Sequence, residues 1–269
     1  MFRLSFASLL LIARSLPAAA FPDEALATAG QAALRLPKPE FPDSELAKLS
    51  ILDITGKGVK DLTGLEKCKG LAELKATKNE ITKLDALKDL PNLQKLDLDN
   101  NKITDITPLA GLAKLQYLEL TGNQVTDIKP LAKLTAMASL YLTGNKITDV
   151  SPLTGLTKLA SLNLGDNPIK DITPLAKLTR INTLELRGTQ VADLSALSGY
   201  TDLKLLMADK AQIVDLGPLV KWAKADAEGA KRFAPYLRLY IAGNPLSEES
   251  KTKHVPALKA LGVRVEDIK

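Results

Sequence analysis

Few residues of this chain have both the type and the spacing that catalysis requires. His254 is the only histidine and Cys68 the only cysteine in 269 residues, and no serine or cysteine nucleophile has a partner within the sequence pattern. A single cysteine forms no disulfide within the chain and builds no cysteine-rich metal site. The chain also lacks a phosphate-binding loop, a zinc motif and a dinucleotide fingerprint. These observations predict a protein that is not an enzyme and uses no cofactor.

A series of aspartates spaced 22 residues apart is the other candidate for chemistry. Its members are Asp127, Asp149, Asp171, Asp193 and Asp215. A ladder of calcium ions is one interpretation of such a series. One acid per repeat beside a helical turn is more simply a cap that accepts backbone hydrogen bonds. We therefore expect turn caps and no metal.

The elements that position these residues are themselves repeated. Leu115, Leu118, Leu120, Asn123 and Val125 recur 22 residues later with the same chemistry, and such a period decides the architecture. The units start at Leu49, Leu71, Leu93, Leu115, Met137, Leu159, Ile181 and Leu203. Within a unit the apolar positions are the first, fourth, sixth, eleventh, fourteenth, seventeenth and twentieth. Cys68 and Trp222 occupy the twentieth position of their units, which predicts that both are buried.

Each unit combines a short strand with a short helical turn. Leu96 and Leu98 alternate with charged residues, a pattern typical of a strand with one buried face. The segment from Asp105 to Leu112 is too short for a long helix and has Pro108 near its start, which predicts one 3₁₀ or α turn.

An asparagine recurs where each predicted strand ends. The set is Asn79, Asn101, Asn123, Asn145, Asn167 and Asn244. A buried turn leaves backbone groups unpaired, and an inward amide can both donate to them and accept from them. We expect these asparagines to be structural. Lys57, Thr189 and Ala211 replace them in three units.

The pattern Leu-x-x-Leu-x-Leu-x-x-Asn-x-Ile-x-Asp-Ile-x-Pro-Leu-x-x-Leu, over about residues 49–246, resembles the 22-residue leucine-rich repeat of bacterial internalin-like proteins. The resemblance implies an α/β fold, a right-handed leucine-rich repeat solenoid. A curved parallel sheet would line its concave face, with short 3₁₀ or α turns on the convex face. The resemblance also supports binding as the class of function. It carries over no particular receptor.

Residues 1–20 are predicted to be a signal peptide. Arg3 precedes a run of about ten apolar or small residues, and Ala18 and Ala20 suit cleavage after Ala20. The run is too short to span a bilayer, which needs roughly 20 residues. We therefore expect export, to the periplasm, the cell surface or the medium, and no membrane span.

An N-terminal helical cap is predicted over residues 21–48. Phe21-Pro-Asp23 and Phe41-Pro-Asp43 each place an aspartate at a helix start, with helices expected over 25–34 and 44–49. These openings are similar to the N-terminal cap of the internalin-like family. The repeats, about nine of them, then cover residues 49–246.

The C-terminal part departs from the repeat. Residues 217–235 are an insertion, in which Leu219, Trp222, Ala230 and Phe233 indicate a helix on the outer side, bent at Gly229. The last unit is expected to begin at Tyr236. A C-terminal cap over 247–269 is predicted to hold a helix from 247 to 261 and a final short strand containing Val265.

Charge patterning excludes one class of partner. The chain has 36 basic and 31 acidic residues, a net charge of +5. The basic residues alternate with acidic ones and do not form a continuous patch. No nucleic acid partner is expected.

The remaining candidate site is the concave face, where packing requires no aromatic or large apolar side chain. Exposed anchors of that kind are typical of protein interfaces. The predicted ligand-binding residues are Tyr117, Glu119, Tyr141, Asn163, Glu185, Arg187, Leu205, Met207 and Tyr240. The predicted function is an exported, non-enzymatic module that binds a protein, with a glycan as the other ligand class. A structural envelope component, a regulator of a partner enzyme and, as the weakest alternative, a hydrolase remain open.

Overall fold

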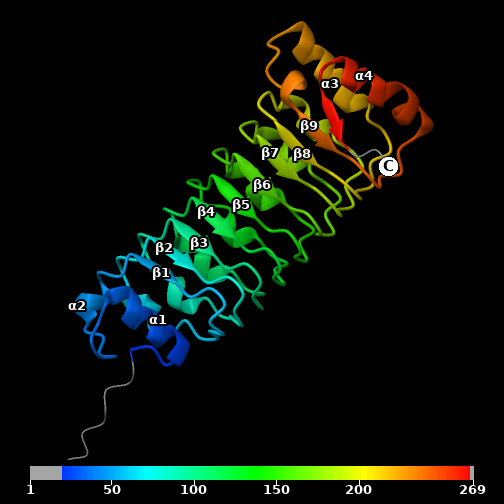
Figure 1. Ribbon diagram of the computed structural model, residues 1–269. Coiled ribbons are helices and arrows are strands. Elements are labelled where there is room, and N and C mark those ends of the chain that lie inside the picture. Colours follow the sequence, from blue (N-terminus) through cyan, green and yellow to red (C-terminus); the bar gives the residue numbers. More distant parts are fainter. Residues whose placement is uncertain (1–19, 267–269) are drawn as a thin grey trace, which may run out of the picture.

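The strands of the repeats form one continuous parallel sheet. The computed structural model describes residues 20–266, so the predicted signal peptide lies outside it except for Ala20. Ten strands follow one another in sequence order (Figure 1). They are β1 (Ile51–Asp53), β2 (Glu73–Lys75), β3 (Lys95–Asp97), β4 (Tyr117–Glu119), β5 (Ser139–Tyr141), β6 (Ser161–Asn163), β7 (Thr183–Glu185), β8 (Leu205–Met207), β9 (Arg238–Tyr240) and β10 (Arg264–Glu266). The predicted leucine-rich repeat solenoid is confirmed.

Short 3₁₀ turns lie between consecutive strands from β1 to β9, and the last of them follows the inserted helix. They span Leu65–Lys67, Asp85–Leu87, Thr107–Gly111, Lys129–Leu131, Ser151–Gly155, Thr173–Lys177, Ser195–Gly199 and Ala234–Tyr236. Where present, proline stands at the first or second position of the turn, as in Thr107–Gly111. Its fixed φ suits that position and its missing N–H costs nothing there. The predicted turn type is therefore confirmed.

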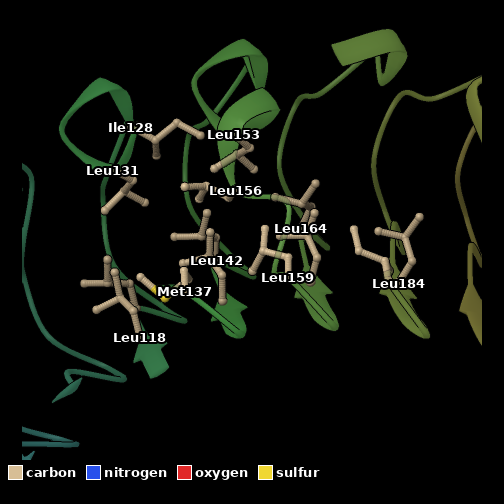
Figure 2. Close-up of a cluster of buried hydrophobic side chains, with 14 of the residues drawn as sticks. Leu118, Ile128, Leu131, Met137, Leu142, Leu153, Leu156, Leu159, Leu164 and Leu184 are labelled. Atoms are coloured by element: carbon tan, nitrogen blue, oxygen red, sulfur yellow. The ribbon is translucent and has the colours of Figure 1, made fainter. Parts of the chain in front are cut away.

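The predicted apolar positions fill the space between strands and turns. Leu118, Leu140 and Leu162 align in register across β4, β5 and β6, and each is fully buried. In Figure 2, Leu142 and Leu164 lie near the strands, and Leu153 lies nearer the turns. Cys68 and Trp222 are also buried, as expected. Since each unit buries its apolar side chains against its neighbours, the array is stable only as a stack.

The asparagines hydrogen-bond to the backbone of two consecutive units. Asn145 Oδ1 accepts from Val125 N at 2.9 Å, and Nδ2 donates to Leu120 O and Leu142 O, each at 2.9 Å. Asn79, Asn101, Asn123 and Asn167 repeat this arrangement. Each side chain thus satisfies buried groups that would otherwise be unpaired. Their structural role is confirmed.

The backbone rearranges where the asparagine is replaced by Thr189. In the preceding unit, Ile169 N has no asparagine to reach and donates to the carbonyl of Asn167 at 2.8 Å. Pro168 stands between these two residues. The same short bond, Leu246 N to Asn244 O at 2.9 Å, occurs around Pro245. In both places the backbone N–H lacks an asparagine acceptor from the following unit, and a carbonyl two residues earlier in the chain accepts its hydrogen bond instead.

Two helices precede the first strand. In α1 (Glu24–Leu34), Asp23 Oδ1 accepts from Leu26 N at 3.0 Å, which confirms its predicted cap. The equivalent prediction for Asp43 is wrong. In α2 (Asp43–Leu46) the N-cap residue is Pro42, and Asp43 is the first helical residue, with its carboxylate 3.3 Å from Lys67 Nζ. Both helices lie at the β1 end of the sheet (Figure 1).

The inserted helix is shorter than predicted. Helix α3 (Gly217–Glu228) ends at Gly229 and does not bend and continue, so Ala230 and Phe233 are not helical. The reason is Asp226, which accepts from the backbone N–H groups of residues 232, 233 and 234 and fixes a reversal of the chain. Phe233 then folds back and stacks on Trp222 with ring centroids 3.8 Å apart.

In the unit after the insertion only the first apolar position differs from the prediction, and the strand keeps its register. Tyr236, the predicted first apolar position, is 62% exposed, and Leu237 is buried in its place. The 3₁₀ turn Ala234–Tyr236 follows Phe233 and carries the tyrosine outward. An unpredicted adjustment occurs at Tyr200, which replaces leucine at a twentieth position. Its hydroxyl donates to Leu175 O at 2.7 Å, which satisfies the buried oxygen.

The chain closes with helix and strand, as predicted. Residues 248–260 are helical, with a π-helical turn at Ser250–His254 followed by α4 (Val255–Ala260). Gly262 follows with φ 93°, and β10 then pairs with β9. None of the helices between residues 20 and 266 combines the length and apolarity needed to cross a membrane.

Candidate concave binding face

Alternate residues of every strand point away from the core and form a second surface of the sheet. We define the concave face as the third, fifth and seventh residues of each unit from β1 to β9. Parallel strands about 4.8 Å apart place these side chains in rows. Register sets Tyr117 opposite Ser139, and Glu119 opposite Tyr141. The predicted diagonal relation of Tyr117 and Tyr141 is confirmed.

The two tyrosines contact each other on this face. Their ring centroids lie 5.4 Å apart at an interplanar angle of 46°, a favourable aromatic geometry. Neither hydroxyl has a hydrogen-bond partner within residues 20–266. Burial raises the pKa of Tyr117 to about 12, and the nearby carboxylates of Glu119 and Asp97 contribute. The pair is a preformed surface element that the core does not use.

Two half-buried glutamates, Glu119 on β4 and Glu185 on β7, lie at the fifth positions of their repeat units. Burial raises the pKa of Glu119, hydrogen bonds from Thr121 oppose the shift, and Asp99 and Asp97 add to it. Burial likewise raises the pKa of Glu185, although Arg187 lowers it. For both carboxylates, the contacts within the chain do not fully replace the hydration that burial removes.

The other predicted residues continue the face toward its C-terminal end. Asn163 lies opposite Tyr141 and Glu185 on the strands beside it. Arg187 Nε is 3.5 Å from Asp209 Oδ2. Leu205 and Met207 are partly exposed on β8, the second of them opposite Tyr240. The structure thus brings all nine predicted residues onto one surface.

Tyr240 differs from the central tyrosines because it is engaged within the chain. The Arg238 guanidinium carbon lies 5.6 Å from the ring centroid, and Arg238 Nη2 also donates to the Tyr240 hydroxyl. Arg238 Nε is 3.9 Å from Glu266 Oε1 on β10. An arginine therefore already covers this Glu–Tyr pair.

A Ser–His–Asp group that the sequence pattern did not indicate lies outside the concave face. His254 Nδ1 is 3.2 Å from both Ser250 Oγ and Asp215 Oδ1. A relay needs the two partners on different ring nitrogens, and here both contact Nδ1. Ser250 is also fully buried, and its Oγ accepts from Leu216 N at 3.0 Å. The group joins the C-terminal helix to the start of α3.

The aspartate series forms turn caps. Asp149 Oδ1 accepts from Ser151 N at 2.8 Å, and Asp127, Asp171, Asp193 and Asp215 make the same bond two residues ahead. In the described part of the chain no three His, Cys, Asp or Glu side chains converge as metal ligands would. Cys68 is fully buried, and this burial raises its pKa to about 12.

Comparison with known proteins agrees with this architecture. The family model for leucine-rich repeats (2 copies) matches residues 69–111, 113–155, 137–177 and 157–199. Internalin C2 of Listeria monocytogenes is 35% identical over 74% of this chain and 89% of its own, with a TM-score of 0.72. The chain belongs to the internalin-like leucine-rich repeat proteins.

Two further structures resemble this internalin-like protein. An internalin of Listeria monocytogenes, inlF, is 26% identical over 96% of this chain and 95% of its own, with a TM-score of 0.67. The leucine-rich repeat ectodomain of the Arabidopsis thaliana membrane receptor kinase GASSHO1/SCHENGEN3 shares the fold at 21% identity, with a TM-score of 0.64. That match covers 77% of this chain and 26% of the ectodomain. No curated protein sequence matches the chain.

Proposed function

We propose that this internalin-like protein is an exported, non-enzymatic module that recognises a protein partner through its concave face. The observation that carries the proposal is the Tyr117–Tyr141 pair, held in contact on the open face of the sheet. Buried or half-buried tyrosines that the core does not require are typical binding anchors. Glu119, Asn163, Glu185, Arg187, Leu205 and Met207 extend this surface along the sheet.

A rigid face suits such a role. The strands are tied to each other by backbone hydrogen bonds and by the asparagines, so binding need not order the backbone. Proteins with this fold include ones solved with protein ligands. The GASSHO1/SCHENGEN3 ectodomain was solved in complex with CASPARIAN STRIP INTEGRITY FACTOR 2, and the plant peptide hormone receptor RGFR1 in complex with RGF2.

The spacing of the two glutamates whose pKa is raised argues against hydrolysis by that pair. Glu119 and Glu185, the two carboxylates whose pKa is raised, lie on β4 and β7. Three strand spacings separate them, about 14 Å, whereas carboxylate pairs that cleave glycosidic bonds lie no more than about 9.5 Å apart. These two carboxylates are therefore too far apart to act together, which argues against hydrolysis by this pair.

Export rests on the N-terminal sequence. Arg3, the apolar run and the Ala18-Ala-Ala20 segment have the composition of a secretory signal. Expression of the full chain in a bacterial host, followed by mass spectrometry of its N-terminus, tests this part. We expect processing after Ala20, and retention of an intact N-terminus in the cytoplasm would contradict export.

The binding proposal is tested by a partner search with the purified chain, followed by titration of each partner found. Tyr117→Ala combined with Tyr141→Ala is expected to weaken binding at least tenfold, because truncation of an interface anchor costs about 2 kcal/mol or more. Tyr236→Ala is the matched control, because Tyr236 is an exposed tyrosine outside the sheet face. Equal binding by all variants would favour a structural envelope component.

A further inference from the structure

The concave face has a net charge opposite in sign to that of the whole chain. It holds seven acidic and four basic side chains, a net charge of −3, whereas the chain as a whole carries +5. The acidic residues are Asp53, Glu73, Asp97, Asp99, Glu119, Glu185 and Asp209, and the basic ones are Lys75, Lys95, Arg187 and Arg238. A surface of one sign favours partners of the other sign and speeds their association.

The acidic residues fall into two groups, those with a cation and those without. Glu73 is 3.4 Å from Lys75 and 3.7 Å from Lys95, and Arg187 and Arg238 pair with Asp209 and Glu266. Five of the seven carboxylates form no ion pair within residues 20–266, namely Asp53, Asp97, Asp99, Glu119 and Glu185. Three of them lie near Tyr117: Asp97 on β3, Asp99 just after β3, and Glu119 on β4.

These carboxylates also keep free hydrogen-bonding capacity. Asp99 Oδ1 is buried, and no donor among the described residues reaches it. Glu119 accepts from Thr121 N at 3.0 Å, and Asp97 accepts from the Thr77 hydroxyl at 2.7 Å. Only neutral donors therefore serve them within the chain. We call Asp97, Asp99, Tyr117, Glu119 and Tyr141 the acidic–aromatic patch.

The chain contains two pairs of a glutamate and a tyrosine on adjacent strands, and one of these pairs already contacts an arginine. Glu119 lies directly opposite Tyr141 across β4 and β5, and Glu266 lies directly opposite Tyr240 across β9 and β10. At the second pair, Arg238 covers the tyrosine ring and approaches the glutamate. Arg238 is two residues before Tyr240, and the residue two before Tyr141 is Ser139. The first pair therefore lacks the arginine that the second pair has.

We propose that the protein partner presents a basic segment whose arginine side chain lies over the acidic–aromatic patch. The inference rests on the proposed function and adds the chemistry of the ligand. A guanidinium stacks on aromatic rings and donates two parallel hydrogen bonds to a carboxylate, which a lysine ammonium does not. No three acidic groups of the described chain are close enough together to hold a metal ion, which favours an organic cation spread over the patch.

Selection of a random peptide library on the full chain identifies a probe for this inference. The selected peptide is then titrated beside a version with citrulline in place of arginine, which removes the charge and keeps the shape. We expect the citrulline peptide and the Glu119→Gln chain each to bind at least about tenfold more weakly, since charged hydrogen bonds are the strong ones. Added salt should weaken the arginine peptide and leave the citrulline peptide unchanged.

Substitution of Ser139 provides a second, independent test of the proposal. Ser139→Arg supplies a guanidinium at the position that Arg238 holds relative to Tyr240, so it should occupy the patch and reduce peptide binding at least about tenfold. Thr183→Arg is the matched control, because it adds the same charge at the third position of its unit, on β7 and away from the patch. Circular dichroism checks that both variants keep the sheet.

The outcomes separate this inference from the proposed function. Peptides that require Tyr117 and Tyr141 but are neutral or acidic, or that bind equally with citrulline, would overturn the basic ligand and leave the concave face as the binding surface. Enrichment of no sequence, or binding that survives loss of both tyrosines, would count against both. Equal loss of binding in Ser139→Arg and Thr183→Arg would reject occupation of this particular patch.

Discussion

Replacing one asparagine of the ladder should weaken the stack by a predictable amount. Asn145 accepts from the buried Val125 N–H and donates to the carbonyls of Leu120 and Leu142. Those two carbonyls keep a second donor, Asn123 and Asn167 respectively. Val125 N has only Asn145 among the described residues. The substitution Asn145→Ala therefore leaves one buried donor unpaired and removes two further bonds of 2.9 Å, together with a long, weak bond of 3.4 Å to Thr143 O.

The size of the effect follows from these losses. An unsatisfied buried donor costs about 1–3 kcal/mol, and each bond lost from a group that keeps a second partner costs about 0.5–1 kcal/mol. We expect Asn145→Ala to lower the free energy of unfolding by about 2–5 kcal/mol. Thr189→Ala is the control, since Thr189 makes one side-chain bond, to Leu186 O at 2.7 Å. It should cost about 1 kcal/mol.

Urea unfolding followed by far-ultraviolet circular dichroism measures both values, and the fluorescence of Trp222 reports on the C-terminal end. Coincidence of the two signals checks that the stack unfolds as one unit. Equal destabilisation by Asn145→Ala and Thr189→Ala would refute the reasoning, because it would mean that the unpaired Val125 N–H carries no cost.

Three further predictions concern other buried groups. Burial raises the pKa of Cys68 to about 12, so we expect its thiol to resist alkylation in the native chain and to react after unfolding, as mass spectrometry can measure. Because the pKa of Glu119 is raised in the folded state, its ionisation opposes folding as pH rises through that pKa. Glu119→Gln should therefore raise the urea midpoint near about pH 7 and have little effect near about pH 4. Asp226→Ala should lower the free energy of unfolding by about 2–4 kcal/mol, since it removes the acceptor of three backbone N–H groups. A similar loss in Glu228→Ala, an exposed neighbour, would contradict that account.

The repeated part of the fold was predictable because every unit buries apolar side chains at the same positions and binds its turn with the same kind of residue. Leu118 and Leu140 hold one register, and Asn123 and Asn145 bind the same kind of turn. A period of 22 residues thus predicts strand, turn and buried positions together. The residues of the concave face are those that alternate with the buried positions along each strand, so they could also be identified from the sequence.

The unrepeated parts were not predictable in the same way. The end of α3 depends on Asp226, whose carboxylate binds N–H groups six to eight residues ahead. That reversal also decides that Leu237 and not Tyr236 enters the core. Periodicity carries no information about such a contact, because it occurs once.

Periodicity does not show which tyrosines of the face already contact another side chain of the chain. Tyr240 and Tyr141 occupy equivalent positions in the sequence pattern. Arg238 covers the first, and no cation of the described chain covers the second. The difference arises from one residue, Arg238 against Ser139, and from the presence of β10 with Glu266. These contacts separate a tyrosine used within the chain from one that remains open to a partner.

Amide hydrogen exchange of the chain, with and without a bound partner or selected peptide, tests binding by the concave face most directly. Binding by the concave face should slow exchange in β3 to β6, centred on Tyr117 and Tyr141, and leave exchange unchanged in the 3₁₀ turns at Thr107–Gly111 and Ser151–Gly155 on the opposite side. Protection confined to those turns, or to α3 and α4, would contradict the account.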